Sequence, residues 1–252
     1  RRRMSAPGLM EYGQETYGAE WAADYDRIFP DVAPGMVDRL AELANGGRVL
    51  ELAIGTGRIA LPLKEREIDV AGIDISPEMV TKLRQKPGGA DISVVMGDFA
   101  DVEIEGKFTL IYLIANTLFC LLDQGEQVRC FRNAASHLEV GGRFVIEAFY
   151  PDLGRFDRSQ RVQANVVERH RVVLEASRHD PITQLVTAQW IELSGEGVTL
   201  RPVVVRYSWP SELDLMGRLA GLELEDRWGG WEGEPFTAQS PRHVSVYKVP
   251  AA

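Results

Sequence analysis

A glycine turn between an apolar segment and a helical one is the part of this sequence that most clearly points to chemistry. It runs Val49-Leu50-Glu51-Leu52-Ala53-Ile54-Gly55-Thr56-Gly57. Glycines at the end of a strand let the backbone approach a ligand closely, and a following helix offers unpaired backbone N–H groups. Asp74 ends the next apolar segment, 17 residues after Gly57. A carboxylate at that position can bind the hydroxyl groups of a ribose, so the pattern predicts a nucleoside-containing ligand.

Two cofactors fit this turn. As Gly55-x-Gly57-x-x-Ala60 followed by an acid, it matches a relaxed dinucleotide fingerprint and predicts an NAD(P)-dependent oxidoreductase. As Glu51-x-x-x-Gly55-x-Gly57 followed by Asp74, it resembles motifs I and II of the class I methyltransferases, which use S-adenosylmethionine (SAM). The rest of the chain must decide between these alternatives.

Two further segments favour SAM. Gly97-Asp98-Phe99 resembles the adenine-recognition position of the family, where Asp98 would accept a hydrogen bond from the exocyclic amine and Phe99 would help to wall the ring. Residues 137–144 resemble the family's glycine turn before the fifth strand. The resemblance covers residues 48–150 and implies SAM as cofactor, with S-adenosylhomocysteine as product. The cofactor-binding residues that it implies are Glu51, Ala53, Gly55, Gly57, Asp74, Ile75, Asp98, Phe99 and Asn116.

The chain departs from the family pattern at one position in the turn. In the family, the acid at Glu51 orders the turn and the methionine end of the cofactor, and glycine usually stands where this chain has Ala53. A methyl group fits there if the backbone φ angle is negative, although it narrows the methionine subsite. The departure also leaves open a protein that binds SAM without catalysis.

Alternating strands and helices must position these residues. The hydrophobic pattern predicts strands over residues 48–53, 70–75, 92–96, 108–114 and 143–149, with helices between them. Nearly continuous apolar strands in this order are typical of a parallel sheet covered on both faces. Two last strands are predicted over 222–228 and 243–249. The sequence thus predicts an α/β fold with a doubly wound, mostly parallel, seven-stranded sheet of the Rossmann-like methyltransferase type.

Two additions to this sheet are predicted. One is an N-terminal helical arm over residues 5–33, and the other is an antiparallel meander of about three strands over 166–177, 184–193 and 198–209. The predicted parts are an arm at 1–47, a SAM-binding core at 48–150, inserted strands at 151–209, and the end of the core at 210–252. This arrangement resembles sugar N,N-dimethyltransferases and glycine N-methyltransferase-like enzymes, in which the insertion roofs the substrate site or builds a dimer. It implies a small-molecule acceptor and leaves a homodimer open.

The residues needed near the methyl group depend on the acceptor. An amine needs little more than a neutral lone pair, whereas a hydroxyl needs a general base within hydrogen-bonding reach. N-methylation is favoured, and O-methylation with His170 as the base is the alternative, because His170 has the strand parity of Val172 and Leu174. The candidate catalytic residues are Tyr17, Asn116 and His170. The candidate substrate-binding residues are Tyr25, Phe149, Trp190 and Trp231.

Composition excludes several other classes of protein. The formal net charge is −9, which disfavours binding to a nucleic-acid backbone. Cys120 and Cys130 are too few for a disulfide framework and lie in apolar surroundings, and the four histidines show no metal-ligand spacing. No apolar run approaches the length of a membrane span, and no apolar stretch follows the first basic residues as in a secretory signal. We therefore expect a cytoplasmic protein without a bound metal.

Overall fold

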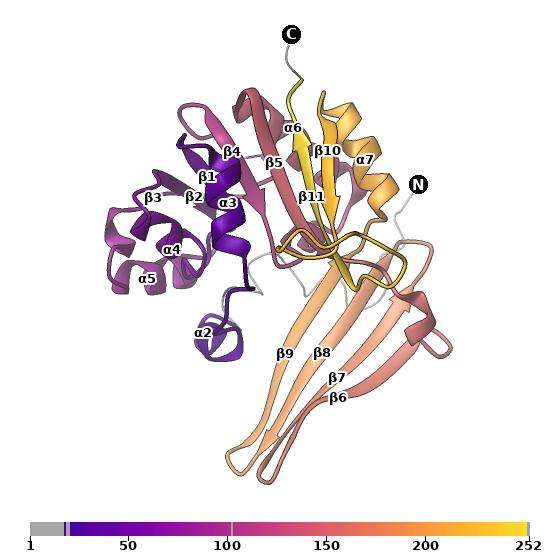
Figure 1. Cartoon of the computed structure of the whole chain (residues 1–252). Coiled ribbons are helices and arrows are strands. Elements are labelled where there is room, and N and C mark those ends of the chain that lie inside the picture. Colours follow the sequence, from indigo (N-terminus) through magenta and orange to yellow (C-terminus); the bar gives the residue numbers. More distant parts are fainter. Residues whose placement is uncertain (1–17, 19–20, 102, 251–252) are drawn as a thin grey trace, which may run out of the picture.

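The computed structural model describes residues 18, 21–101 and 103–250. Its larger sheet has seven strands in the order β10-β11-β5-β4-β1-β2-β3 (Figure 1). β11 pairs antiparallel with both β10 and β5, and the other four pairs of adjacent strands are parallel. The strands are β1 (Val49–Leu52), β2 (Val70–Asp74), β3 (Ser93–Met96), β4 (Phe108–Leu113), β5 (Leu138–Phe149), β10 (Glu223–Trp228) and β11 (Arg242–Lys248). The predicted doubly wound, mostly parallel sheet is confirmed.

Helices cover both faces of this sheet because its strands are apolar on both sides. In β1, Val49 packs in a cluster with helices α3, α4 and α5, whereas the next residue, Leu50, packs in a cluster with α6 and α7. The helices are α3 (Met36–Ala44), α4 (Ala60–Glu65), α5 (Pro77–Gln85), α6 (Gln124–His137) and α7 (Pro210–Leu219). The connections within the described residues also contain the 3₁₀ helices η2 (Gly89–Asp91), η3 (Thr117–Cys120) and η4 (Leu153–Arg155).

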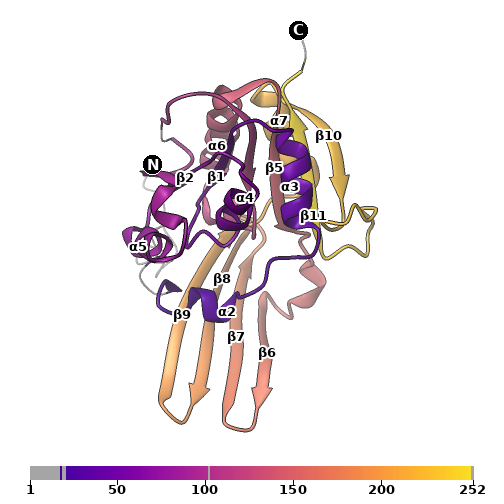
Figure 2. The ribbon, with the colours of Figure 1, turned by 60° about the vertical axis from the view of Figure 1, so that its left-hand side comes forward.

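The inserted segment forms a second, antiparallel sheet of four strands. They are β6 (Gln160–Glu168), β7 (Arg171–Asp180), β8 (Leu185–Ser194) and β9 (Gly197–Arg206), in sequential order. This sheet extends from the edge at which β5 ends (Figures 1 and 2). The predicted single strand over 166–177 is wrong, because Arg169 and His170 form a turn that joins β6 to β7.

The N-terminal arm joins the inserted sheet to the glycine turn. The described part of the arm contains the short helix α2 (Tyr25–Ile28), and about half of the helical arm predicted over residues 5–33 lies outside the described residues. Trp21 Nε1 donates a hydrogen bond to the Pro202 carbonyl on β9 (3.2 Å). On the other side, the carboxylate of Asp26 accepts one from Thr56 Oγ1 in the glycine turn (2.6 Å).

Candidate active site

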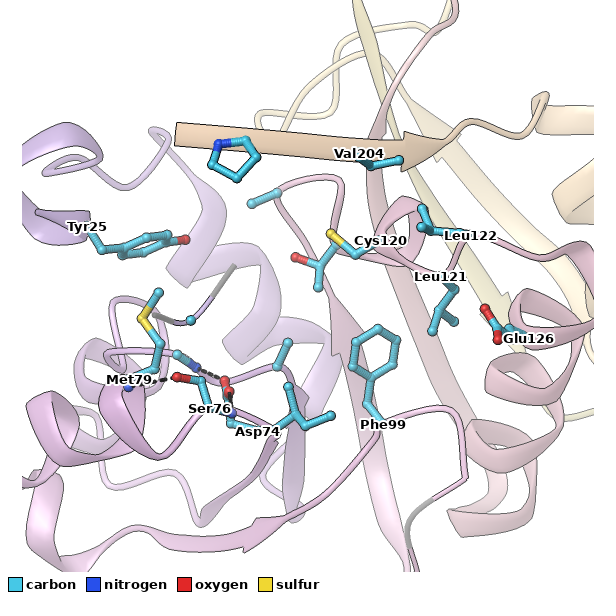
Figure 3. Close-up of a pocket in the computed structure, with 17 residues that line it drawn as sticks. Tyr25, Asp74, Ser76, Met79, Phe99, Cys120, Leu121, Leu122, Glu126 and Val204 are labelled. Atoms are coloured by element: carbon cyan, nitrogen blue, oxygen red, sulfur yellow. Dashed lines mark hydrogen bonds between the residues drawn. The ribbon is translucent and has the colours of Figure 1, made fainter. Parts of the chain in front are cut away.

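A cavity of about 330 Å³ opens beside the C-terminal ends of β1, β2 and β4. Figure 3 shows that its lining comes from the arm, the ends of these strands, the η3 segment and β9 of the inserted sheet. The carboxyl ends of parallel strands are where open α/β sheets bind their ligands. Of the nine predicted cofactor residues, five line this cavity: Ala53, Gly55, Asp74, Ile75 and Phe99.

Asp74 fastens the glycine turn to the end of β2. Its Oδ2 accepts a hydrogen bond from the Gly55 N–H (2.6 Å), and its Oδ1 accepts one from the Ser76 N–H (2.8 Å). Burial raises the pKa of Asp74, and these two backbone donors oppose the rise. Each carboxylate oxygen has a second lone pair, so Asp74 can still accept hydrogen bonds from a ligand in the cavity.

Glu51 lies behind the cavity wall rather than in its lining. It is 4% exposed, and its Oε2 accepts a hydrogen bond from the Tyr112 hydroxyl (2.8 Å). Burial raises the pKa of Glu51 to about 8, although the bond from Tyr112 and the nearby charge of Arg58 act in the opposite direction. The structure therefore places a carboxyl group that titrates close to neutral pH directly under the glycine turn.

The glycine turn is built from left-handed residues. The φ angles of Ala53, Gly55 and Gly57 are 56°, 56° and 77°. The condition under which a methyl group fits easily at Ala53, a negative φ, is therefore not met, and the methyl group sits in a conformation that glycine adopts more easily. A Cβ on Gly57 would come within 2.3 Å of a Leu83 methyl group, so this glycine is required for packing against α5.

Replacing Ala53 with glycine should stabilise the protein slightly. Release from the left-handed strain gains about 1–2 kcal/mol, and the added entropy of glycine in the unfolded chain costs about 0.4–1 kcal/mol. We expect the melting temperature to rise by up to about 4 °C and SAM affinity to stay equal or improve. Differential scanning fluorimetry measures the first and calorimetry the second. Ala71→Gly, at a buried position within β2, is the matched control and should lower the melting temperature.

The adenine side of the predicted site is only partly in the cavity. Ile75 and Phe99 line it from the ends of β2 and β3. Asp98 lies next to Phe99, but its Oδ1 accepts a hydrogen bond from the Ala100 N–H (2.9 Å) and its side chain is not part of the lining. Asp98 therefore holds the turn that presents Phe99.

Only some of the residues predicted near the methyl group line the cavity. Tyr25 of the arm lines the cavity, and burial is the main cause that raises its pKa. Tyr17 lies outside the described residues. Asn116 is not in the lining, because its Oδ1 accepts a hydrogen bond from the Phe149 N–H (2.7 Å). Phe149 itself packs on Phe119, with ring centroids 5.0 Å apart, and does not line the cavity.

Three predicted residues lie away from the cavity. His170 is exposed in the turn between β6 and β7, at the tip of the inserted sheet farthest from the main sheet (Figure 1). Its predicted position on an apolar strand face is therefore wrong. Trp190 packs against Trp21 of the arm, with centroids 5.6 Å apart, and Trp231 is buried in the core. Both tryptophans are thus in packing contacts outside the cavity lining, and their predicted contact with substrate stays a prediction.

Several lining residues could not be singled out from sequence. Thr117, Cys120 and Leu121 come from the η3 segment, and Pro202 and Val204 project from β9. The side chain of Leu121 lies near Phe99 and Glu126, and Val204 lies on the side opposite Phe99 (Figure 3). Burial raises the pKa of the Cys120 thiol to about 12, so this cysteine stays protonated.

Metal-ligand clusters and membrane-spanning helices are both absent from the described part of the chain. It holds no cluster of three or more metal-binding side chains. None of its helices has the length and apolar composition needed to cross a membrane.

Several known proteins resemble this chain. Residues 49–142 match a family model described as a methyltransferase domain. The structure of the CcbJ methyltransferase from Streptomyces caelestis superposes with a TM-score of 0.88 at 39% identity, covering 95% of this chain and 100% of that one. The cypemycin N-terminal methyltransferase from a Streptomyces species is 28% identical over 80% of this chain and 83% of its own length. The dTDP-3-amino-3,4,6-trideoxy-alpha-D-glucopyranose N,N-dimethyltransferase of Streptomyces venezuelae is 27% identical over 50% of this chain and 52% of its own length.

The match to CcbJ spans nearly the whole chain, including the inserted strands, and the sheet order is that predicted for a Rossmann-like methyltransferase. The glycine turn also left open a nicotinamide oxidoreductase, but these relatives are methyltransferases. The chain therefore belongs to the class I SAM-dependent methyltransferases of the small-molecule type.

Proposed function

We propose that the cavity binds SAM and that the protein transfers the methyl group to the amine of a small acceptor. The observation that carries the proposal is the placement of Asp74 and Gly55 at one edge of the cavity. Asp74 offers acceptor oxygens for a ribose, and a Cβ added to Gly55 would meet nothing closer than 4.0 Å, so a ligand has room against the backbone there. The volume of about 330 Å³ is within the range of small-ligand sites.

Each end of SAM has a matching group on the protein. Asp74 would hold the ribose hydroxyls, while Ile75 and Phe99 would pack on the adenine ring, with Asp98 holding the turn that presents Phe99. Glu51 would act on the methionine end through the turn above it. When bound, SAM supplies an electrophilic methyl group on a sulfonium sulfur.

The protein's own task is then to align the acceptor and exclude water. Pro202 and Val204 of β9 roof the cavity, and Tyr25 of the arm closes one side, so the lining above the glycine turn is largely apolar. Such a setting holds the amine lone pair in line with the methyl–sulfur bond and keeps water away from the sulfonium. The narrow, roofed space fits a small molecule and not a duplex nucleic acid.

The lining favours an amine over a hydroxyl acceptor. Among the described residues that line the cavity there is no histidine or lysine, and burial raises the pKa values of Cys120 and Tyr25. The two carboxylates in the lining, Asp74 and Glu126, already accept hydrogen bonds from backbone N–H groups. A neutral amine attacks without such a base, whereas a hydroxyl needs one. Two relatives are named for transfer to nitrogen, one at a peptide N-terminus and one at an amino sugar, which supports the same choice.

An acceptor screen with methyl-labelled SAM tests this proposal. Matched pairs of amino and hydroxy compounds, including amino sugars and short peptides with free or acetylated N-termini, should be labelled only on the amino member. Labelling of hydroxyl groups alone would contradict transfer to nitrogen. Binding of SAM without transfer to any acceptor would indicate a protein that binds the cofactor without catalysis.

His170→Ala gives a second, simple prediction. Because His170 is exposed in a turn at the far tip of the inserted sheet, removing the imidazole should change the transfer rate by less than about twofold. Steady-state rates on an acceptor found in the screen measure this effect. A rate reduced by orders of magnitude would restore His170 as the base of an O-methyltransferase.

A further inference from the structure

The cavity wall contains a backbone turn in a strained conformation. Ala115 and Asn116 follow β4, with φ angles of 56° and 66°. Residues other than glycine seldom adopt this left-handed region, and such strain persists only where the surroundings enforce it. Ala115 and Thr117 line the cavity on either side of Asn116, so the turn sets the shape of the wall.

A buried carboxylate on the neighbouring strand holds this turn. Glu147 is 5% exposed and lies in β5, which pairs with β4 (Figure 1). Its Oε2 accepts a hydrogen bond from the Ala115 N–H (3.1 Å), and its backbone carbonyl accepts one from the Asn116 N–H (3.2 Å). Two residues further along β5, the Phe149 N–H donates to Asn116 Oδ1. The end of β5 therefore binds the turn at three atoms.

The second oxygen of Glu147 is held from the opposite side. Its Oε1 accepts hydrogen bonds from Trp231 Nε1 (3.1 Å) and from the Arg242 guanidinium (3.2 Å). Trp231 is buried in the loop between β10 and β11, whereas the side chain of Arg242 is 53% exposed. Donors on both oxygens fix the orientation of a buried carboxylate. The loop and β11 are thereby connected to the cavity wall through one side chain.

We propose that Glu147 is a positioning residue for methyl transfer. It keeps the Ala115–Asn116 turn in its left-handed conformation. This conformation shapes the cavity wall at the end of β4 so that the acceptor amine fits beside the methyl group. The inference rests on the proposed function, because it assigns the acceptor to this part of the cavity. Glu147 does not itself line the cavity and acts only through the turn.

Three variants test this role. Glu147→Gln keeps the side-chain size but replaces one acceptor oxygen with an NH2 group, which donates hydrogen bonds and cannot accept them. Glu225→Gln is the matched control. Glu225 lies on the outer strand β10 of the same sheet and also forms ion pairs, with Arg143 and Lys248. In the double variant of Glu147→Gln with Ala115→Gly, glycine should adopt the left-handed turn without the help of Glu147.

Amide hydrogen exchange is the readout that needs no acceptor. In Glu147→Gln the Ala115 and Asn116 amides should exchange about tenfold faster than in Glu225→Gln, because a hydrogen bond to a charged group is lost locally. S-adenosylhomocysteine affinity should stay within about threefold of the wild type, since Asp74 and Gly55 are untouched. With an acceptor from the screen, transfer should fall about tenfold, and the added Ala115→Gly should restore most of it.

Two results would overturn the proposal. One is exchange at Ala115 and Asn116 that is no faster in Glu147→Gln than in the control. The other is a loss of transfer that Ala115→Gly fails to restore, which would mark Glu147 as important for general stability only. A wild-type protein without transfer to any acceptor would instead contradict the proposed function, and the exchange rates would still show whether Glu147 holds the turn.

Discussion

Asp74→Ala should weaken the binding of SAM and S-adenosylhomocysteine by about 1–3 kcal/mol, or about 5- to 150-fold in Kd. The carboxylate is expected to accept hydrogen bonds from the ribose, and in the structure it also ties down the Gly55 and Ser76 N–H groups. Its removal therefore takes away a ligand contact and loosens the turn against which the ligand packs. Isothermal calorimetry with S-adenosylhomocysteine measures the effect without interference from turnover.

Two comparison variants separate these contributions. Asp74→Asn keeps one acceptor oxygen and should lose less affinity than Asp74→Ala. Asp101→Ala removes an exposed carboxylate that is paired with Arg129, and it should leave the affinity unchanged. If Asp74→Ala binds as tightly as Asp101→Ala, Asp74 has no role in holding the ribose.

Glu51 should make both stability and cofactor affinity depend on pH. Its pKa rises from an ordinary 4.5 to about 8 in the folded protein, so between these values the folded state binds more protons than the unfolded state. This difference lowers the free energy of unfolding as pH increases through the window, by up to about 1.4 kcal/mol for each pH unit. His243, whose pKa burial lowers from 6.5 to about 4, acts in the opposite direction below about pH 6.5, so the net fall is expected between about pH 6.5 and 8. A cationic cofactor near Glu51 favours the ionised carboxylate, so SAM affinity should rise with pH and binding should release protons.

Substitutions at two positions check the assignment to Glu51. Glu51→Gln should remove the fall in stability between about pH 6.5 and 8, whereas the rise that His243 causes below about pH 6.5 should remain. Tyr112→Phe removes the hydroxyl that stabilises the ionised form and should move the transition to higher pH. Denaturant unfolding at about pH 5, 7 and 9 provides the stabilities. Wild-type stability that rises between about pH 6.5 and 8 would contradict the account.

The core sheet and its helix starts are predictable because local signals and tertiary structure agree there. Ser76 has the residue type and position of a cap for a helix beginning with Pro77, and its Oγ accepts a hydrogen bond from the Met79 N–H (3.2 Å) at the start of α5. The apolar runs that mark β1 and β2 also place Gly55 and Asp74 at the same sheet edge. For that reason the cofactor side of the cavity is largely predictable from sequence.

The acceptor side depends on packing that no local pattern reveals. The β6–β7 turn contains no glycine or proline, and the alternating residues on both sides of it have the pattern of one continuous strand, which misplaces His170. Trp231 has the composition of a binding-site residue, but its ring fills the core and its nitrogen binds Glu147. The role of Glu147 itself arises only when β5 is laid beside the end of β4. Roof residues such as Val204 are likewise defined by how the inserted sheet meets the main sheet.

The most direct measurement of the central claim is isothermal calorimetry of the purified protein with SAM, S-adenosylhomocysteine and NADH in parallel. The account predicts that both sulfur compounds bind with micromolar dissociation constants, that their binding is weakened by Asp74→Ala, and that NADH gives no heat of binding. Binding of NADH without affinity for either sulfur compound would contradict it.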